Sequence, residues 1–288
     1  MKILRTKQAA RDWARAGRLE GKTLGLVPTM GVLHAGHMQL VAAAAAYDRV
    51  VVSLFVNPMQ FGQASDLAAY PRDEARDFDL LRAAGVDAVF TPDISEIYHA
   101  ETQTTVLTDQ LDTILMGALR KGHFRGVCTV ITKLFNILQP DSAVFGEKDY
   151  QQLLVIRTMV RDLDMPVDII GAPTVRESDG LAMSSRNLRL NAADRAAAPV
   201  LSAALDYGQT RVADGITAAA LEAEVADFIT REPAAMLETV DVRDAETLAE
   251  VDGLIMTPVV ILLASRFGEV LLIDQRVAVP APVLEGAK

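Results

Sequence analysis

The stretch KTLGLVPTMGVLHAGHMQLVAAAAAY, residues 22–47, carries the pattern that decides the fold. Its first eight residues, 22–29, form a mostly apolar run that is closed by a proline, which is typical of a buried strand. A turn flanked by Gly31 and Gly36 follows, and the alanine-rich segment after it predicts a helix. A buried strand, a glycine-flanked turn and a helix in this order indicate a parallel α/β sheet.

The same alternation continues outward along the first 175 residues. Apolar runs predict further strands at 49–58, 86–92, 142–146 and 167–175, and helices are expected at 6–18, 74–85, 126–140 and 149–163. Strands that are apolar on both faces indicate a parallel sheet covered by helices on both faces, so we expect a Rossmann-like α/β fold. Ligands of such sheets bind beyond the carboxyl ends of the strands. The candidate loops are therefore 28–37, 57–61, 146–152 and 175–186.

The pattern changes after residue 176. Alanine-rich helical stretches at 192–213 and 217–231 precede TPVVILLASRFGEVLLID, residues 257–274, which has the form of a hairpin. We therefore expect two domains, a Rossmann-like catalytic domain at 1–176 and a smaller C-terminal α+β domain at 177–288.

Composition excludes several classes of function. The 288 residues carry 28 basic and 38 acidic side chains, a net charge of −10, which argues against a nucleic-acid partner. The single cysteine, Cys128, allows no intrachain disulfide and falls on the apolar stripe of an expected helix, where it reads as a core residue. The longest aliphatic run near the C-terminus, 259–264, is too short to span a bilayer, and the N-terminus lacks the apolar run of a signal peptide. We expect a cytoplasmic protein with no membrane partner.

His34 and His37 are two of only four histidines and lie three residues apart where the helix should begin. On a first helical turn they share a face, next to free backbone N–H groups and a positive partial charge. This combination suits a phosphate. A zinc site would need a third ligand, and simple capping of the helix is the other alternative. The strand, turn and helix in this order favour phosphate binding.

Other loops carry polar side chains with two possible readings. Lys148 and Asp149 follow a strand and could meet phosphate and ribose oxygens, or form a solvated turn. The segment MSSR, residues 183–186, has two hydroxyls and a guanidinium, which suit a phosphate clamp. The alternative is an ordinary loop without a ligand. Gln60 and Gln152 are neutral donors, one after an expected strand and one in an expected helix, and Gln152 could simply lie on a solvated helix face.

Seven blocks of the sequence, in order along almost the whole chain, resemble the pantoate–β-alanine ligase family, whose variant His-x-Gly-His signature is shared with nucleotidyl-transferring enzymes. The blocks are PTMGVLHAGHMQL (28–40), SLFVNPMQFG (53–62), YPRD (70–73), GHFRGVCTVITKLFNILQPD (122–141), FGEKDYQQL (145–153), DGLAMSSRN (179–187) and VDVRDAETL (240–248). Two loop positions depart from the family pattern: Lys121 and His99 stand where proline is usual.

The resemblance implies a reaction in two steps. ATP and pantoate give pantoyl adenylate and pyrophosphate, and the amine of β-alanine then attacks the adenylate to give pantothenate and AMP. It also implies Mg²⁺ with ATP, a homodimer and a C-terminal domain that acts as a lid. The alternatives are a nucleotidyltransferase of the same fold, which would retain AMP in its product, and a non-catalytic nucleotide-binding relative.

The resemblance also implies roles for individual residues. The catalytic residues would be His34, His37 as proton donor, Lys148 and Arg186. ATP would contact Met30, Gly31, Val32, Leu33, His34, Ala35, Gly36, His37, Gly146, Glu147, Lys148, Asp149, Val175, Met183, Ser184, Ser185 and Arg186. Gln60 and Gln152 would hold pantoate, and Gln60 would also contact β-alanine. No metal ligand is assigned, although Asp77 is a candidate for helping to place magnesium; the alternative is a carboxylate on a solvated helix face.

Overall fold

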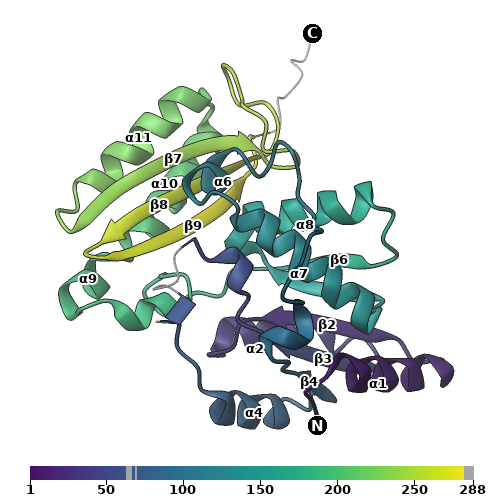
Figure 1. Cartoon of the computed structure of the whole chain (residues 1–288). Helices are drawn as coiled ribbons and strands as arrows, with labels where there is room; N and C mark the ends of the chain where they lie inside the picture. The colour runs from purple at the N-terminus through teal and green to yellow at the C-terminus, as the bar shows by residue number, and fades with distance from the viewer. Residues whose placement is uncertain (63–66, 69, 282–288) are drawn as a thin grey trace. The chain divides into compact units, whose positions relative to one another are not determined.

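The computed structural model describes residues 1–62, 67–68 and 70–281. The chain divides into two compact units, the first from Met1 to Thr174 and the second from Val175 onward. Each unit has its own sheet (Figure 1). The hydrophobic clusters of buried residues that the structure describes also belong to one unit each, two to the first and one to the second. No helix in the described part of the chain is long and apolar enough to cross a membrane.

The first unit is built on a six-stranded sheet with the order β1-β4-β3-β2-β5-β6. Its strands are β1 (Lys2–Leu4), β2 (Leu24–Thr29), β3 (Arg49–Leu54), β4 (Ala88–Phe90), β5 (Ser142–Gly146) and β6 (Asp168–Ala172). Every pair of neighbouring strands is parallel. The chain leaves the central strand β2 toward β3 and β4 on one side and returns to β5 and β6 on the other. The carboxyl ends of β2 and β5 therefore form the switch point at which such sheets bind ligands.

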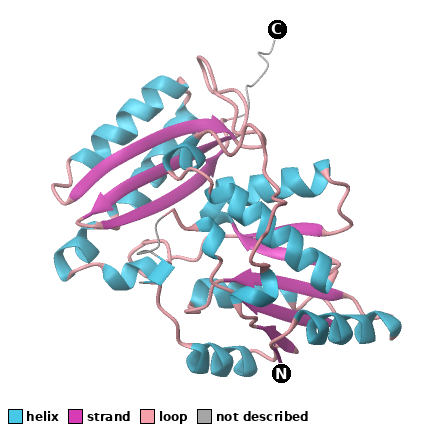
Figure 2. Ribbon diagram, viewed as in Figure 1, coloured by secondary structure: helices cyan, strands magenta, loops and turns pink. Residues whose placement is uncertain are grey.

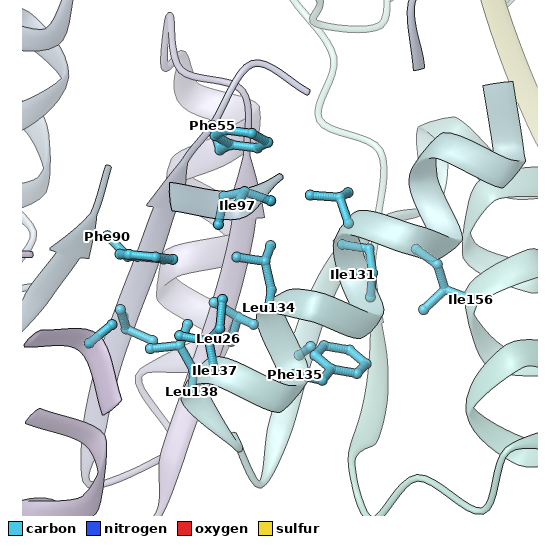
Figure 3. Packing of buried hydrophobic residues seen from close by; sticks show 14 of the residues in the cluster. Leu26, Phe55, Phe90, Ile97, Ile131, Leu134, Phe135, Ile137, Leu138 and Ile156 are labelled. Atoms are coloured by element: carbon cyan, nitrogen blue, oxygen red, sulfur yellow. The ribbon is translucent and has the colours of Figure 1, made fainter. Parts of the chain in front are cut away.

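Helices cover both faces of this sheet, as the sequence predicts. They are α1 (Lys7–Leu19), α2 (Ala35–Ala44), α4 (Glu74–Ala83), α5 (Ile94–Ile97), α6 (Leu115–Leu119), α7 (His123–Leu138) and α8 (Tyr150–Asp162), with short 3-10 turns η1 (Pro58–Gln60) and η2 (Glu147–Asp149). Successive side chains of a strand point to opposite faces of the sheet. Leu26 of β2 therefore packs with α1, α7 and α8, whereas Val27 packs with α2 and α4. Figure 3 shows the first of these cores, in which Leu26 and Phe90 meet Leu134 of α7.

The second unit is the expected smaller α+β fold (Figure 2). Strands β7 (Ala235–Asp244), β8 (Val259–Phe267) and β9 (Val270–Ala278) form an antiparallel sheet, and helices η3 (Ser185–Arg189), α9 (Ala192–Ala197), α10 (Val200–Asp214) and α11 (Ala218–Thr230) belong to the same unit. The hairpin of β8 and β9 is confirmed, and Gly268 in its turn adopts a φ of +56°.

Some element boundaries differ from those that the sequence predicts. The single helix expected at 192–213 is divided into α9 and α10 at Pro199, because proline lacks the N–H that a helix interior needs. The strand expected at 49–58 ends at Leu54, and the polar segment beyond it turns into η1. Strand β1 was not expected, since three residues at a sheet edge give almost no periodic signal.

Candidate active site

The turn between β2 and α2, residues 30–34, has an unusual backbone. Gly31 has a φ of +85° and Val32 has a φ of +54°. Glycine adopts left-handed angles freely, but a β-branched residue does so at a cost of about 1–3 kcal/mol. The turn is also tied to the sheet, because the Thr29 hydroxyl accepts from Gly31 N at 3.2 Å and donates to Ser53 O at 2.8 Å. The surrounding structure therefore holds this turn in one conformation.

His34 and His37 cap the first turn of α2 with their own side chains. His34 Nδ1 accepts from Gly36 N at 3.1 Å, and His37 Nδ1 accepts from His34 N at 3.3 Å. The two ring centroids are 4.1 Å apart. A ring nitrogen that accepts a hydrogen bond carries no proton, so the proton of each neutral ring is on Nε2. Capping and anion binding are thus compatible here, because each ring caps the helix through Nδ1 and keeps an Nε2–H donor.

The surroundings favour the neutral form of both rings. Burial, followed by the charges of Lys148 and Arg76, lowers the pKa of His34. Burial is also the main cause that lowers the pKa of His37 to about 3, with His34 and Lys148 adding to it and Asp149 opposing it. At neutral pH the pair therefore offers two neutral donors beside a lysine, an arrangement suited to an anion.

Lys148 and Asp149 reach this site from η2, which follows β5 directly. Strand β5 lies beside β2 in the sheet, and the helix α2 passes over it, so that Gly146 approaches Leu40 of α2. Adjacent parallel strands end at the same edge of the sheet, which explains why the charges of Lys148 and Asp149 act on His37 although these residues are far apart in the sequence. The structure brings His34, His37, Lys148 and Asp149 together.

Gln60 is the third group at this edge. Its Nε2 donates to Met30 Sδ at 2.9 Å, and its Oε1 accepts from Asn57 Nδ2 at 3.0 Å. Asn57 is only 1% exposed and bonds further to Gly126 O and Tyr98 OH, at 3.0 and 2.8 Å. A buried asparagine with these partners fixes the direction in which Gln60 points.

The helix α7 contributes to the same region through Gly126. A Cβ placed on Gly126 would lie 2.5 Å from Met59 O, so only glycine lets α7 approach η1 this closely. His123 Nδ1 also lies 3.0 Å from Gln60 O. Tyr98 and Gly126 were not predicted as part of this region; a glycine within an otherwise apolar helix was the one sequence signal of a close approach. Cys128 is fully buried, as expected, and burial raises its pKa to about 12.

The paired glutamines at the start of α8 have different environments. Gln151 is buried and binds the chain before α6, with its Nε2 donating to Leu111 O and Ile114 O, both at 2.9 Å. Gln152 is half-buried, and within the described residues its amide has no hydrogen-bond partner. The structural anchor is therefore Gln151, and Gln152 keeps its amide for other contacts.

The environment of Asp77 differs from the solvated helix face that the sequence suggested as one alternative. The residue is 2% exposed, and its two carboxylate oxygens accept from Val32 N at 2.8 Å and Leu33 N at 2.7 Å. Because both oxygens are occupied by backbone donors, this geometry favours anchoring of the turn over placement of magnesium. Among the described residues, no three His, Cys, Asp or Glu side chains come together as a metal site.

Residues 183–186 belong to the second unit and are held there by a separate network. Met183 N donates to Val175 O at 2.9 Å, and Ser184 Oγ accepts from Arg186 N at 3.2 Å. Arg176, next to Val175, forms a bidentate pair with the buried Asp274 of β9 at 2.6 and 2.9 Å. The loop that carries Ser184, Ser185 and Arg186 is therefore anchored to the C-terminal sheet.

Comparisons with known proteins agree with this geometry. The family profile described as pantoate-beta-alanine ligase matches residues 2–277. The chain is 53% identical to a pantothenate synthetase of Agrobacterium fabrum over 279 residues, which cover 96% of each chain. It is 50% identical to the pantothenate synthetase of Sinorhizobium medicae over 282 residues, 97% of each chain.

Solved structures show the same likeness. A pantothenate synthetase from Thermus thermophilus superposes with a TM-score of 0.90 at 42% identity, covering 96% of this chain and 99% of the other. A pantoate-beta-alanine ligase from Francisella tularensis, crystallised with beta-gamma ATP and β-alanine, superposes with a TM-score of 0.79 at 31% identity, covering 96% and 97%. The resemblance seen in the sequence is confirmed, and the chain belongs to the pantoate–β-alanine ligase family.

Proposed function

We propose that this enzyme condenses pantoate with β-alanine in an ATP-dependent reaction that passes through pantoyl adenylate and releases AMP and pyrophosphate. One observation carries the proposal: two neutral histidines at the start of α2 each have an Nε2–H donor and lie within the electrostatic reach of Lys148. This set of donors matches the charge that develops on a phosphoryl group during adenylation.

In the first step a carboxylate oxygen of pantoate attacks the α-phosphorus of ATP. The bond from this phosphorus to the bridging oxygen breaks, and pyrophosphate leaves with the bonding electron pair. The Nε2–H groups of His34 and His37 and the ammonium of Lys148 would stabilise the phosphoryl oxygens in the transition state. Because the pKa of His37 is lowered to about 3, we propose that its donor role is a hydrogen bond from a neutral ring.

In the second step the amine of β-alanine attacks the carbonyl carbon of the adenylate. The acyl–oxygen bond breaks, AMP leaves, and the amine nitrogen loses a proton as the amide forms. Gln60 and Gln152 would orient pantoate, and Gln60 would also contact β-alanine. The Asn57 contact with Gln60 supports this role, because it holds the amide in place without adding a charge beside the attacking carboxylate.

The remaining ATP contacts would come from both units. We assign residues 30–37 and 146–149 of the first unit, and Val175 with residues 183–186 of the second, to ATP, with Arg186 as a mobile phosphate clamp in a C-terminal lid. The Francisella tularensis relative, crystallised with beta-gamma ATP and β-alanine, supports these two substrates for this chain. Mg²⁺ would arrive with the phosphates of ATP, whose oxygens are the ligands that it prefers.

Two properties of the whole protein complete the proposal. The family resemblance supports a homodimer, and the single buried cysteine suits a reducing cytoplasm. Light scattering on the purified protein would test the first: a mass near twice 31.1 kDa is expected, and a mass near 31.1 kDa would contradict it.

Product analysis tests the reaction itself. The purified protein with ATP, Mg²⁺, pantoate and β-alanine should form pantothenate, AMP and pyrophosphate in equal amounts, as measured by mass spectrometry. A nucleotidyltransferase of the same fold would instead leave AMP attached to its final product when β-alanine is present. Release of ADP and phosphate, or a stable adenylated product, would contradict the proposal.

A further inference from the structure

The side chain of Asp77 joins two parts of the first unit that are far apart in the sequence. It lies in α4 and accepts from backbone amides of the turn before α2, which are 44 and 45 residues away. The residue is 2% exposed, whereas Asp79 on the same helix has a side chain that is 79% exposed and paired with Arg82. Helix α4 therefore carries one buried carboxylate and one exposed carboxylate two positions apart.

The turn that Asp77 binds is shaped around the carboxylate. Gly31 and Val32 both have positive φ angles, and the N–H groups of Val32 and Leu33 converge on the two carboxylate oxygens. A Cβ placed on Gly31 would lie 3.0 Å from Asp77 Oδ2. Successive backbone N–H groups in such turns form a concave site for an anion. Here an internal carboxylate occupies that site.

The position of this turn determines how the two histidines are presented. Leu33 is directly followed by His34, whose backbone N–H donates to His37 Nδ1. If the peptide planes at Val32 and Leu33 rotated, the His34 N–H would move, and with it the bond that fixes His37 with its proton on Nε2. Val32 is β-branched and adopts its positive φ only where the surroundings hold it.

We infer that Asp77 is a positioning residue for adenylation: its carboxylate holds the turn so that His34 and His37 direct their Nε2–H groups toward the phosphoryl group. This inference rests on the proposed function, because it assigns the histidines to phosphate. It differs from a role for Asp77 in binding magnesium, in which a carboxylate oxygen would coordinate the ion directly.

Asp77→Asn tests the inference with little change in shape. The amide keeps one acceptor oxygen but faces the second backbone N–H with an NH₂ group, so one bond is replaced by a clash of donors. We expect pantoate-dependent ATP–pyrophosphate exchange at saturating ATP and Mg²⁺ to fall roughly tenfold or more. Attack of β-alanine on chemically supplied pantoyl adenylate should change only a few-fold, because no pyrophosphate leaves in that step. Asp79→Asn is the matched control and should leave both rates unchanged.

The ratio of the two rates separates the possible roles, since it does not depend on the fraction of folded protein. Equal loss in both half-reactions would show a merely structural role and overturn the inference. An increased Mg²⁺ requirement with an unchanged maximal rate would overturn it in favour of a metal ligand. If the wild-type protein shows no pantoate-dependent exchange, the proposed function fails, whereas wild-type exchange that Asp77→Asn leaves intact contradicts only the inference.

A second variant tests the same contact from the side of the turn. Glycine adopts a φ near +54° without strain. In a Val32→Gly background the turn should thus keep its conformation with less help from the Asp77 carboxylate. The loss of exchange caused by Asp77→Asn should therefore be smaller in that background than in wild type. Losses of the same size in both backgrounds would contradict the proposed coupling between Asp77 and the strained turn.

Discussion

At the scale of single residues, the protonation of the histidine pair is the feature with the clearest consequence. An ordinary histidine has a pKa of about 6.5 and would be partly charged near neutrality. Both pKa values here are lowered, that of His37 to about 3, so the neutral form of both rings is favoured near neutrality and His37 stays neutral well below it. The site therefore offers neutral imidazole donors at neutral pH.

A pH profile checks this directly. The single-turnover rate of adenylate formation should not rise as the pH falls from about 8 to about 6, because His37, with its pKa lowered to about 3, stays neutral and pantoate is already ionised. If an imidazolium of His37 were required as the proton donor, the rate would instead rise toward lower pH through about 6.5. Such a rise, absent in a His37→Gln variant, would contradict the neutral-donor account.

Some features of individual residues could be predicted from the sequence and others could not. The strand, turn and helix around His34 were predictable because periodicity and glycine placement are local signals. The buried positions of Asp77 and Asn57 were not, because their distant partners lie 41 to 69 residues away and follow from the packing of helices on the sheet. Nor does any local pattern indicate a positive φ at Val32.

At the scale of elements, the close approach of α7 to η1 determines where Gln60 lies. Gly126→Ala would place a methyl group 2.5 Å from Met59 O, so η1 must shift. We expect the KM for pantoate to rise roughly tenfold, with a smaller change in the KM for ATP, since Gln60 is assigned to the acid. Asn136→Ala, on the exposed face of α7, is the control. Equal increases in both KM values would show that the packing of α7 does not act through Gln60.

The second unit has a comparable anchor in the pair of Arg176 and Asp274. Asp274 is 3% exposed, and Arg176 also donates to Gly180 O at 3.0 Å, so the pair ties the loop before η3 to β9. Asp274→Ala leaves the partly buried guanidinium of Arg176 without its carboxylate partner, which destabilises the unit by up to about 3–5 kcal/mol, the range typical of fully buried pairs.

The expected result is a lower melting temperature together with a raised KM for ATP, measured by circular dichroism and steady-state kinetics. Glu250→Ala, which removes an 82% exposed partner of Arg243, should change neither. An unchanged KM for ATP despite the loss of stability would separate this anchor from the loop of residues 183–186.

At the scale of the whole molecule, the sequence predicted the parallel sheet with helices on both faces and the hairpin of β8 and β9 in a smaller α+β domain, but not the third strand of that small sheet, β7. Both predicted features depend on long apolar runs separated by turn residues, which sequence periodicity reports well. Sequence periodicity did not predict the edge strand β1, because so short an element gives a weak signal. Nor did it predict that one expected helix is divided at Pro199. Contacts between segments that are distant in the sequence could be identified only in the folded structure.

The central claim, that one acid is activated by ATP before the amine enters, is tested most directly by ATP–pyrophosphate exchange. With labelled pyrophosphate, ATP and Mg²⁺, the label should enter ATP when pantoate is added, and β-alanine should not be needed. His34, His37 and Lys148 are proposed as donors to one phosphoryl group, in the step that needs pantoate and not β-alanine, and this dependence is therefore expected. Exchange that is equally fast without any acid, or that requires β-alanine in place of pantoate, would contradict it.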